Sequence, residues 1–308
     1  MKIKIRRVID KVKHYMRGDL YCRQMDTLML LGKLNIERIR HLEEVRSLHD
    51  VEFKVFSQWG EDGIIQYLIW KLPIPNKTFV EFGVETYIES NTRFLLMNDN
   101  WGGLVMDGSQ RNVDAIREDP IYWRHDLTAV ASFITRDNIN RLIESHVDHD
   151  DIGLLSIDID GNDYWVWKEI TAVNPRIVIC EYNSVFGAER AVTIPYQEDF
   201  HRTRAHYSNL YWGASLAALC KLAEEKNYQF VGSNSAGNNA FFVRKDLSSG
   251  LPKLSAKEGY VQSRFREARD ERGRLTHLAG QDRLREIQEM SVCDLDSGKI
   301  VSIKDLYS

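Results

Sequence analysis

Residues 78–108, TFVEFGVETYIESNTRFLLMNDNWGGLVMDG, decide the fold of this chain. The stretch opens with a short apolar run that carries Glu81 and stops at Gly83, and a polar loop then leads into a helix-like segment. A second apolar run follows and ends on Asp107. A strand, a glycine turn, a helix and a second strand that ends in an acid form the first half of a nucleotide-binding βαβ unit. The stretch therefore predicts a cofactor that contains adenosine, and it leaves open which one.

Strand-like and helix-like segments alternate through the middle of the chain. We expect strands at 78–82, 103–107, 121–124, 153–160 and 176–182, and helices at about 64–72, 135–147, 163–170 and 214–228. Residues 229–247 are typical of two strands around a Gly/Asn/Ser turn, which is an antiparallel hairpin at the edge of a sheet. This alternation predicts an α/β fold with a doubly wound, mostly parallel seven-stranded sheet.

The chain divides into three parts. Residues 1–50 are expected to form a helical arm, residues 51–250 the α/β domain, and residues 251–308 a charged helical extension. Apolar residues of the arm recur at helical spacing, and we interpret Gly18 and Gly32 as breaks between helices. A stripe of this kind is usually a packing face, against the main domain or a second subunit, and we expect a homo-oligomer.

Charge is unevenly distributed over these parts. Residues 1–50 hold 12 Lys and Arg against 7 Asp and Glu, whereas the remainder holds 29 against 38. The acidic body argues against binding to nucleic acid. The basic arm suits peripheral contact with an anionic membrane surface or partner, and the simpler interpretation is a solvated helical arm used in self-association.

The composition is that of a soluble globular protein. Hydrophobic residues make up 43% of the chain and charged residues 28%, and no apolar run approaches the roughly 18 residues of a transmembrane helix. The N-terminal sequence has neither the apolar core nor the cleavage site of a signal peptide. The four cysteines are far apart and form no CxxC pair, so we expect free thiols in a reduced, cytoplasmic setting.

Acidic and polar residues follow the expected strands, at the edge where open parallel sheets bind ligands. In strand order they are Glu81 with Gly83, Asp107, Asp126, Asp158 with Asp160, and Glu181 with Asn183. A single loop acid is more often solvated than functional. Five consecutive strands that each bring a carboxylate to the same edge indicate a shared ligand site.

Together these motifs resemble the class I S-adenosylmethionine-dependent methyltransferases, and within them the FkbM-like group. The resemblance covers roughly residues 53–246 and rests on FSQWGEDG, on VEFGV…ESNT…W.GL.MDG, on LLSIDIDGND…W…P.IVICEYN and on the closing NAFFV hairpin. It implies a Rossmann-like methyltransferase fold with S-adenosylmethionine as cofactor. It also implies methyl transfer to a sugar hydroxyl of a surface glycan or a glycosylated metabolite.

The same resemblance assigns cofactor contacts to residues of this sequence. Glu81 and Gly83 would lie beside the methionine part of the cofactor, and Asp107 would accept the ribose hydroxyls. Asp126 and Leu127 would flank the adenine. The other implied contacts are Glu61 and Asp62 at the amino-acid end of the cofactor, together with Asn91, Gly108 and Asp158.

The first loop departs from the pattern E-x-G-x-G-x-G of that class. Here Gly83 is followed by Val-Glu-Thr-Tyr, without the later glycines that let a backbone approach a ligand closely. Glu85 and Tyr87 must therefore either turn away from the cofactor or replace those contacts.

Asp158 and Asp160 are the best candidates for reaction chemistry. Residues two apart on a strand face the same side, so both carboxylates are expected in one pocket, with Glu181 and Asn183 from the next strand. Carboxylates clustered with an amide suit Mg²⁺ or another divalent cation as ligands. The pattern is also similar to metal-dependent sugar O-methyltransferases, which implies Asp158 and Glu181 as ligands and Asp160 as the general base. The alternative is a helix N-cap at Asp163 and no metal.

Histidines of the polar segment after the last parallel strand are further candidates. His206, with His201 and Tyr207 nearby, lies where this fold commonly places substrate-binding insertions. An imidazole near the transferred methyl group can deprotonate a hydroxyl, since its ordinary pKa is about 6.5. A histidine in a surface loop is the commoner case, and His206 is our second catalytic candidate after Asp160.

Two other functions fit parts of the sequence. An NAD(P)-dependent oxidoreductase would keep the fold, but the chain lacks the G-x-G-x-x-G motif of dinucleotide sites. A non-catalytic scaffold of a glycan-assembly complex would explain the altered first loop and the basic arm. The leading hypothesis is the methyltransferase, with a sugar or glycan as substrate and no nucleic acid partner.

Overall fold

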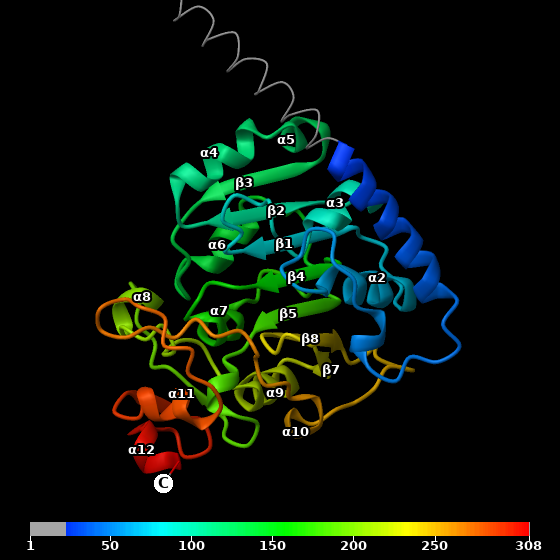
Figure 1. Cartoon of the computed structure of the whole chain (residues 1–308). Helices are drawn as coiled ribbons and strands as arrows, with labels where there is room; N and C mark the ends of the chain where they lie inside the picture. Colours follow the sequence, from blue (N-terminus) through cyan, green and yellow to red (C-terminus); the bar gives the residue numbers. More distant parts are fainter. Residues whose placement is uncertain (1–22, 308) are drawn as a thin grey trace, which may run out of the picture.

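The structure, a computed structural model, describes residues 23–307. A seven-stranded sheet with the strand order β3-β2-β1-β4-β5-β8-β7 runs through the main body (Figure 1). Its strands are β1 (Thr78–Phe82), β2 (Gly102–Asp107), β3 (Leu127–Ala131), β4 (Leu154–Ile157), β5 (Ile177–Glu181), β7 (Tyr228–Ser233) and β8 (Asn239–Arg244). Strands β1 to β5 are parallel, whereas β8 is antiparallel to both of its neighbours. The predicted α/β fold class, with its antiparallel edge hairpin, is confirmed.

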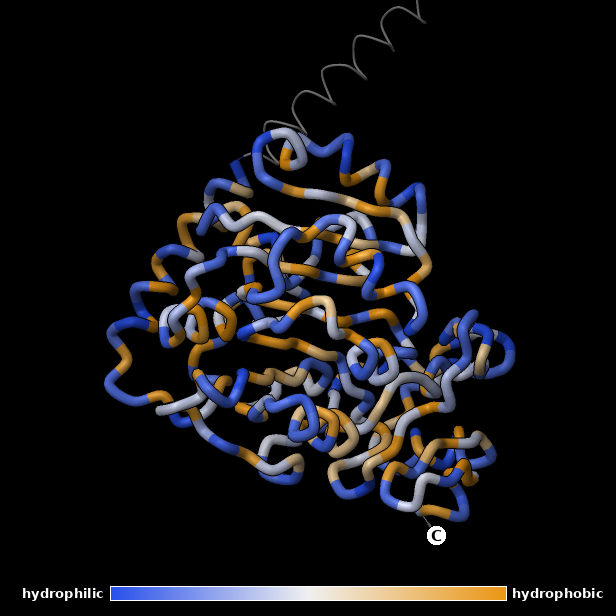
Figure 2. Tube along the Cα trace, turned by 180° about the vertical axis from the view of Figure 1, so that it is seen from behind, coloured by the Kyte–Doolittle hydropathy of each residue, from blue (hydrophilic) through white to orange (hydrophobic). Residues whose placement is uncertain are grey.

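Helices cover both faces of this sheet (Figure 1). They are α2 (Glu61–Lys71), α3 (Arg93–Asp99), α4 (Gln110–Glu118), α5 (Pro120–Arg124), α6 (Ile139–Glu144), α7 (Asp163–Glu169) and α9 (Leu216–Glu225). Side chains alternate between the two faces along each strand, so Phe79 joins one hydrophobic core and Val80 the other. Because both faces are covered, the central strands are almost wholly apolar, as Figure 2 shows.

A helix over residues 23–40 packs on the core that contains α2, α3 and α4. Its residues Ile36 and Ile39 are buried, whereas Leu30, Leu31 and Leu34 are exposed. The interpretation of Gly32 as a helix break is wrong, because the helix continues through it. A Cβ atom there would lie 2.8 Å from Cζ of Phe94 and 2.9 Å from Cγ2 of Val55, so this glycine permits close packing. Gly18 lies outside the described residues.

The third strand is not where the sequence pattern indicates. Residues 121–124 belong to the short helix α5, and the strand follows at 127–131. Asp119 caps α5 by accepting a hydrogen bond from the Ile121 amide, and Pro120 occupies the first turn. An Asp–Pro pair of this kind starts a helix despite the β-forming residues that follow.

The C-terminal extension packs against the insertion that follows β5. The remaining elements are η1 (Leu48–Val51), η2 (Ser184–Phe186), β6 (Val192–Thr193), α8 (Arg202–Ala205), α10 (Ala256–Gly259), α11 (Gln281–Glu286), β9 (Ser291–Asp294), β10 (Lys299–Ser302) and α12 (Ile303–Tyr307). Strands β10, β9 and β6 form a second sheet over a third hydrophobic core. The prediction of a helical extension is wrong in part, because short helices alternate there with strands and loops. None of the described helices combines the length and apolar character needed to cross a bilayer.

Candidate functional site

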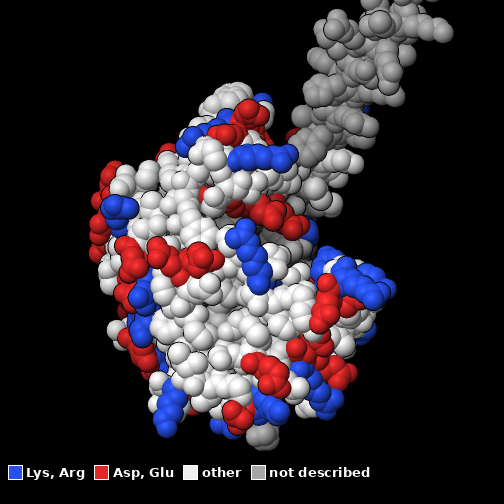
Figure 3. All heavy atoms as spheres, turned by 90° about the vertical axis from the view of Figure 1, so that its left-hand side faces the viewer, with Lys and Arg blue, Asp and Glu red and all other residues white. Residues whose placement is uncertain are grey.

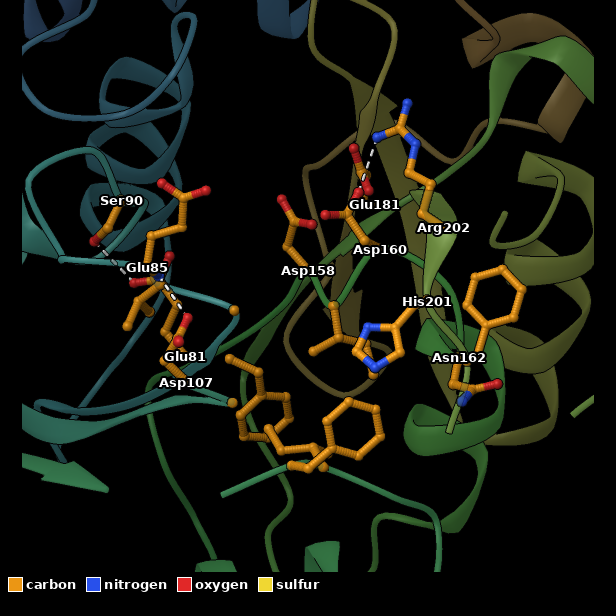
Figure 4. Close-up of a pocket in the computed structure, with 18 of the residues that line it drawn as sticks. Glu81, Glu85, Ser90, Asp107, Asp158, Asp160, Asn162, Glu181, His201 and Arg202 are labelled. Atoms are coloured by element: carbon orange, nitrogen blue, oxygen red, sulfur yellow. Dashed lines mark hydrogen bonds and ion pairs between the residues drawn. The ribbon is translucent and has the colours of Figure 1, made fainter. Parts of the chain in front are cut away.

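A cavity of about 620 Å³ lies beyond the carboxyl ends of the parallel strands. This volume is within the range of about 300–1,000 Å³ typical of small-molecule and cofactor sites. Most of its lining residues lie at, or just after, the carboxyl ends of the five parallel strands, and others lie in α8 and in the C-terminal extension. They are Gln58, Glu81–Glu85, Glu89–Asn91, Asp107, Gly108, Ser132–Ile134, Asp158–Asp160, Asn162, Glu181, Phe200–Thr203, Asn209, Asn239 and Glu267. Figure 4 shows two acidic groups facing each other across it, one around Asp107 and the other around Asp158.

Asp107 lies at the end of β2, and most of the acceptor positions of its carboxylate are used by hydrogen bonds within the protein. Its Oδ1 accepts hydrogen bonds from the Ser109 amide and from Asn112, at 2.8 and 2.9 Å. Its Oδ2 accepts one from the Glu85 amide at 2.8 Å. A carboxylate offers about four acceptor positions, so one position remains for a ligand hydroxyl. The structure thus leaves room for one strong ribose contact, where the sequence suggested two.

Glu81 fastens the loop that leads into α3. Its carboxylate accepts hydrogen bonds from the amides of Asn91 and Thr92 and from the hydroxyls of Ser90 and Thr92. Burial raises the pKa of Glu81, although these hydrogen bonds favour its charged form. The predicted cofactor residues Glu81 and Asn91 therefore both line the cavity, and they are joined to each other.

The first loop forms without the missing glycines because two other residues adopt the left-handed conformation. Glu85 has a φ of 48° and Tyr87 a φ of 61°. Tyr87 turns away from the cavity, is fully buried, and contacts the Thr92 hydroxyl at 2.9 Å. Glu85 stays at the cavity, where its amide binds Asp107. The loop thus closes on Asp107 through its own backbone.

Asp158, Asp160 and Glu181 form an acid triad on the other side of the cavity (Figure 4). One carboxylate oxygen from each lies within 4.8 Å of the others. Glu181 is only 7% exposed, and its Oε2 has no hydrogen-bond partner within the described chain. Burial, followed by the charge of Asp158, raises the pKa of Glu181 well above its usual range. Burial and the neighbouring acids do the same for the pKa of Asp158.

Local structure explains how the triad converges. Their spacing suggested that Asp158 and Asp160 lie on a strand. Strand β4 ends at Ile157, however, so both residues lie in the loop beyond it. Asp163 holds this loop, because its two carboxylate oxygens accept hydrogen bonds from the amides of Ile159 and Gly161 at 2.8 and 2.9 Å. Asp160 takes a φ of 56° within that turn.

Arg202, which the sequence analysis missed, lies against the triad. Its Nη1 donates to Asp160 Oδ1 at 2.9 Å, its Nη2 contacts Glu267, and its Nε donates to the Asn209 carbonyl oxygen at 2.8 Å. Its guanidinium carbon lies 4.7 Å from the centre of the Trp212 ring. Burial alone would lower the pKa of Arg202, but the nearby carboxylates outweigh it and raise that pKa.

Several predicted site residues do not line the cavity. Glu61 is buried and accepts hydrogen bonds from the side chains of Asn234 and Asn239. The Asp62 carboxylate accepts hydrogen bonds from the three backbone amides of residues 55–57, and burial raises its pKa to about 6. Asn183, predicted as a metal ligand, uses its side chain to bind the Val185 amide and two carbonyl oxygens. These residues hold loops in place.

The predicted adenine contacts are also displaced, because they depended on the wrong third strand. Asp126 is exposed and, with Leu127, lies at the amino end of β3, opposite the cavity. The residues that follow β3 at the cavity are Ser132 and Phe133. Phe133 is 42% exposed and lies beside Gly108, since a Cβ atom on Gly108 would be 3.6 Å from its ring. Correct bounds for the strand would have identified it.

The two candidate histidines have different positions. The Nδ1 atom of His206 lies 2.7 Å from the Ser208 hydroxyl, the ring packs on Tyr207, and the residue does not line the cavity. His201 does line it, with its ring centre 5.5 Å from that of Phe133. Sequence position alone does not separate two histidines of one polar segment.

No protein-family model and no curated protein matches the chain. Solved structures similar to it include the N-terminal domain of EvdMO1 with SAH bound, at 11% identity and a TM-score of 0.39, covering 68% of this chain and 93% of that one. Another is TrmK of M. capricolum in complex with S-adenosylhomocysteine, at 10% identity and a TM-score of 0.37, covering 62% and 73%. A third is a putative O-methyltransferase from Klebsiella pneumoniae, at 12% identity and a TM-score of 0.36, covering 70% and 87%.

Proposed function

We propose that this protein is an S-adenosylmethionine-dependent O-methyltransferase that acts on a sugar hydroxyl. The observation that carries the proposal is the acid-lined cavity at the carboxyl ends of the strands, with a cofactor half around Asp107 and a reactive half at the acid triad. When bound, the cofactor supplies a methyl group on a positively charged sulfur. The residues of this chain bind it, orient the acceptor and take up the acceptor's proton.

The cofactor half suits an adenosine carrying a positive charge. Asp107 keeps one acceptor position for a ribose hydroxyl, and the exposed ring of Phe133 offers a surface for an adenine to stack on. Glu85 and Glu89 bring further carboxylates to the cavity. S-adenosylmethionine carries a sulfonium, an ammonium and one carboxylate, so its net charge of about +1 complements an acidic site.

The same charges disfavour a dinucleotide, the alternative that keeps the fold. In dinucleotide sites the pyrophosphate binds at the N-terminus of the first crossover helix. Here Glu81 already occupies that position, because its carboxylate accepts the amides of Asn91 and Thr92. A pyrophosphate would have to displace a buried carboxylate and then face the acids of the cavity.

The acid triad is the proposed binding place for a divalent cation. Three carboxylates are a ligand set for Mg²⁺ or Mn²⁺, and the unpartnered Glu181 Oε2 is a buried acceptor that a cation would satisfy. Asp158, Asp160 and Glu181 would hold the ion. An ion there would lower the pKa of an acceptor hydroxyl and help to orient it.

The proton of the acceptor hydroxyl needs a base within the cavity. His201 takes the place proposed for His206, because it lines the cavity and His206 does not. Asp160 remains a candidate if the reaction proceeds without a metal, since its carboxylate also lines the cavity. In both cases the proton leaves the hydroxyl oxygen as that oxygen bonds to the methyl carbon and the carbon–sulfur bond breaks.

The surface around the cavity favours a small or neutral acceptor over a polynucleotide. Figure 3 views the side of the molecule towards which the parallel strands point, and its described residues intersperse acidic with basic side chains. Polynucleotide binding requires a continuous basic surface, which these residues do not form. Surface glycans and glycosylated metabolites stay the proposed acceptors, with the cavity's many oxygen acceptors facing their hydroxyls.

Titration calorimetry tests the cofactor directly. We expect S-adenosylmethionine and S-adenosylhomocysteine to bind the full chain, and Asp107→Asn to weaken both about 10- to 100-fold, since a hydrogen bond to a charged group contributes about 1.5–3 kcal/mol. Asp114→Asn, an exposed acid on α4, is the matched control. Absence of binding by the folded wild-type protein would reject the proposal. Thermal stabilisation by NAD(P) in place of S-adenosylmethionine would favour the oxidoreductase.

A scaffold without activity makes a separate prediction. It would convert no S-adenosylmethionine to S-adenosylhomocysteine with any glycan acceptor. Measured methyl transfer to one acceptor, lost in Asp158→Asn, would remove that alternative.

A further inference from the structure

Arg202 is the only lysine or arginine among the described residues that line the cavity. Its side chain is 15% exposed and is held from four sides, by Asp160, Glu267, the Asn209 carbonyl oxygen and the Trp212 ring. These contacts come from the loop after β4, the segment after α8 and the C-terminal extension. A guanidinium with this many partners is fixed in place in the absence of any ligand.

The single positive charge of Arg202 does not neutralise all of the acidic side chains around it. Arg202 forms ion pairs with Asp160 and Glu267, and its charge also acts on Glu181, so a single positive charge faces Glu267 and the three acids of the triad. Among residues 23–307, Glu181 Oε2 is a buried acceptor without a hydrogen-bond partner. The acid triad is therefore only partly compensated by the protein, and it retains attraction for a further cation.

Arg202 and a divalent ion would use the same carboxylate. Arg202 binds Oδ1 of Asp160, and that carboxylate also belongs to the set whose oxygens lie within 4.8 Å of one another. An ion on Asp160 would be about 5 Å from the guanidinium, and charges of +2 and +1 at that distance repel each other even in a dielectric as high as that of water. When both cations bind Asp160, each therefore binds it with lower affinity than it would alone.

We propose that Arg202 is the resident counter-ion of the acid triad and that a divalent cation displaces it from Asp160. The inference rests on the proposed divalent ion of the site. Arg202 keeps Glu267, Asn209 and Trp212 as partners after it leaves Asp160, so displacement does not leave a buried charge unpaired. Its effect is to keep the affinity for the ion low and the ion exchangeable.

Binding of Mn²⁺ alone to the metal-free full chain, followed by electron paramagnetic resonance and calorimetry, tests this. We expect Arg202→Gln to bind Mn²⁺ at least about tenfold more tightly than wild type, since the repulsion described above is removed. Arg202→Lys keeps the charge and should stay within about threefold of wild type. Arg204→Gln, an exposed arginine of the same helix α8, should bind as wild type does. Asp160→Asn should bind more weakly.

Three results would overturn the proposal. The first is an Arg202→Gln variant that folds, as judged by circular dichroism, and binds Mn²⁺ no more tightly than wild type. The second is an Arg202→Lys variant that binds Mn²⁺ at least about tenfold more tightly than wild type, which would assign Arg202 a role based on its shape. This second comparison needs only wild type and Arg202→Lys, so it also decides where Arg202→Gln does not fold. The third is that wild type and variants all bind no Mn²⁺ while S-adenosylhomocysteine still binds, which would reject this inference and leave the proposed cofactor intact. Loss of both ligands in wild type would reject the proposed function itself.

Discussion

At Gly83 the chain just after β1 passes close to the loop after β4. A Cβ atom there would lie 1.6 Å from the backbone oxygen of Asp158, and the residue has a φ of +71°. Gly83→Ala should therefore cost more than about 4 kcal/mol of unfolding free energy, in the range reserved for severe core defects. Urea unfolding at a single pH measures it.

A matched glycine separates the clash from the backbone conformation. Gly298 has a φ of +70°, but apart from its chain neighbours no atom of the described residues lies within 4 Å of its Cβ position. Gly298→Ala should cost only about 1–2 kcal/mol, the penalty of a left-handed residue that carries a side chain. Equal losses in the two variants would show that Gly83 is needed for its dihedral angle alone.

Glu181 should make the stability of the protein depend on pH. Its pKa is raised by burial in the folded state, so the folded protein binds more protons than the unfolded chain above the ordinary pKa of a glutamate. Stability should then fall as pH rises from about 4.5 towards the folded pKa, by about 1.4 kcal/mol per pH unit. In EDTA, Glu181→Gln should be more stable than wild type at pH 8 and about equal to it at pH 4.5.

An exposed acid serves as the control for that experiment. Glu144→Gln on α6 should keep the wild-type pH dependence. If Glu181→Gln gains no stability at pH 8, the folded protein does not penalise the charged form of Glu181, and the acid triad is better solvated than its burial indicates.

The positions of single residues agree with the prediction where the ends of strands determine them. They differ from it where hydrogen-bond partners determine which way a side chain points. Glu81, Asp107, Asp158 and Glu181 all reach one cavity, because parallel strands end at one edge. The role of Asp62 could not be read from its position. It turns inward because three amides of residues 55–57 converge on it, and sequence spacing does not report such a convergence.

At the scale of elements, the helix over residues 23–40 provides a test in which local propensity and packing disagree. Alanine favours a helix over glycine by about 1 kcal/mol. The Cβ of Ala at position 32 would nevertheless meet Phe94 and Val55 at under 3 Å, and overpacking of a core costs about 1–3 kcal/mol. Since the overpacking cost exceeds the helix gain, Gly32→Ala should destabilise the protein by about 1 kcal/mol in chemical denaturation.

The neighbouring Lys33 is exposed, so Lys33→Ala should change stability by no more than about 0.5 kcal/mol. A Gly32→Ala variant as stable as wild type would mean that the helix moves freely on the domain. In that case the arm would behave as a separate part of the chain, as the predicted division into three parts has it.

Elements were predicted most accurately where apolar periodicity was strong. Strands β1 and β2 and helix α7 lie within a residue or so of their expected bounds. The error at β3 arose because the β-forming residues at 121–123 outweighed the cap at Asp119 and Pro120 in our reading of the pattern. An N-cap followed by a proline, as at Asp119 and Pro120, is a stronger indication of structure than the β-propensity of the three residues that follow.

At the scale of the whole molecule, the third hydrophobic core joins the C-terminal extension to the insertion after β5. Val292 on β9 is fully buried in that core, whereas Ile300 on β10 is 63% exposed. Val292→Ala should lower the unfolding free energy of the chain by about 1–3 kcal/mol, and Ile300→Ala by no more than about 0.5 kcal/mol. Differential scanning calorimetry should show one transition that moves as a whole.

A separate early transition in Val292→Ala would instead make residues 251–308 an independent unit, as the predicted domain division has it. The sequence could not decide this. The charged stretch at 253–291 buries few side chains, and one of them, Ser263, bonds the Ser184 hydroxyl 79 residues away, a contact that sequence spacing does not report.

The acidity of the cavity has a consequence for turnover. On the proposed function, methyl transfer converts a cofactor with a net charge of about +1 into a neutral product, because the sulfonium becomes a thioether. Carboxylates such as Glu85, Glu89 and Asp107, which line the cavity, attract the charged cofactor and are indifferent to the neutral product. Methyl transfer thus removes part of the electrostatic attraction that brought the cofactor into the cavity. An enzyme built in this way binds its spent cofactor more weakly than its fresh cofactor, and it should be less sensitive to product inhibition at low ionic strength than at high.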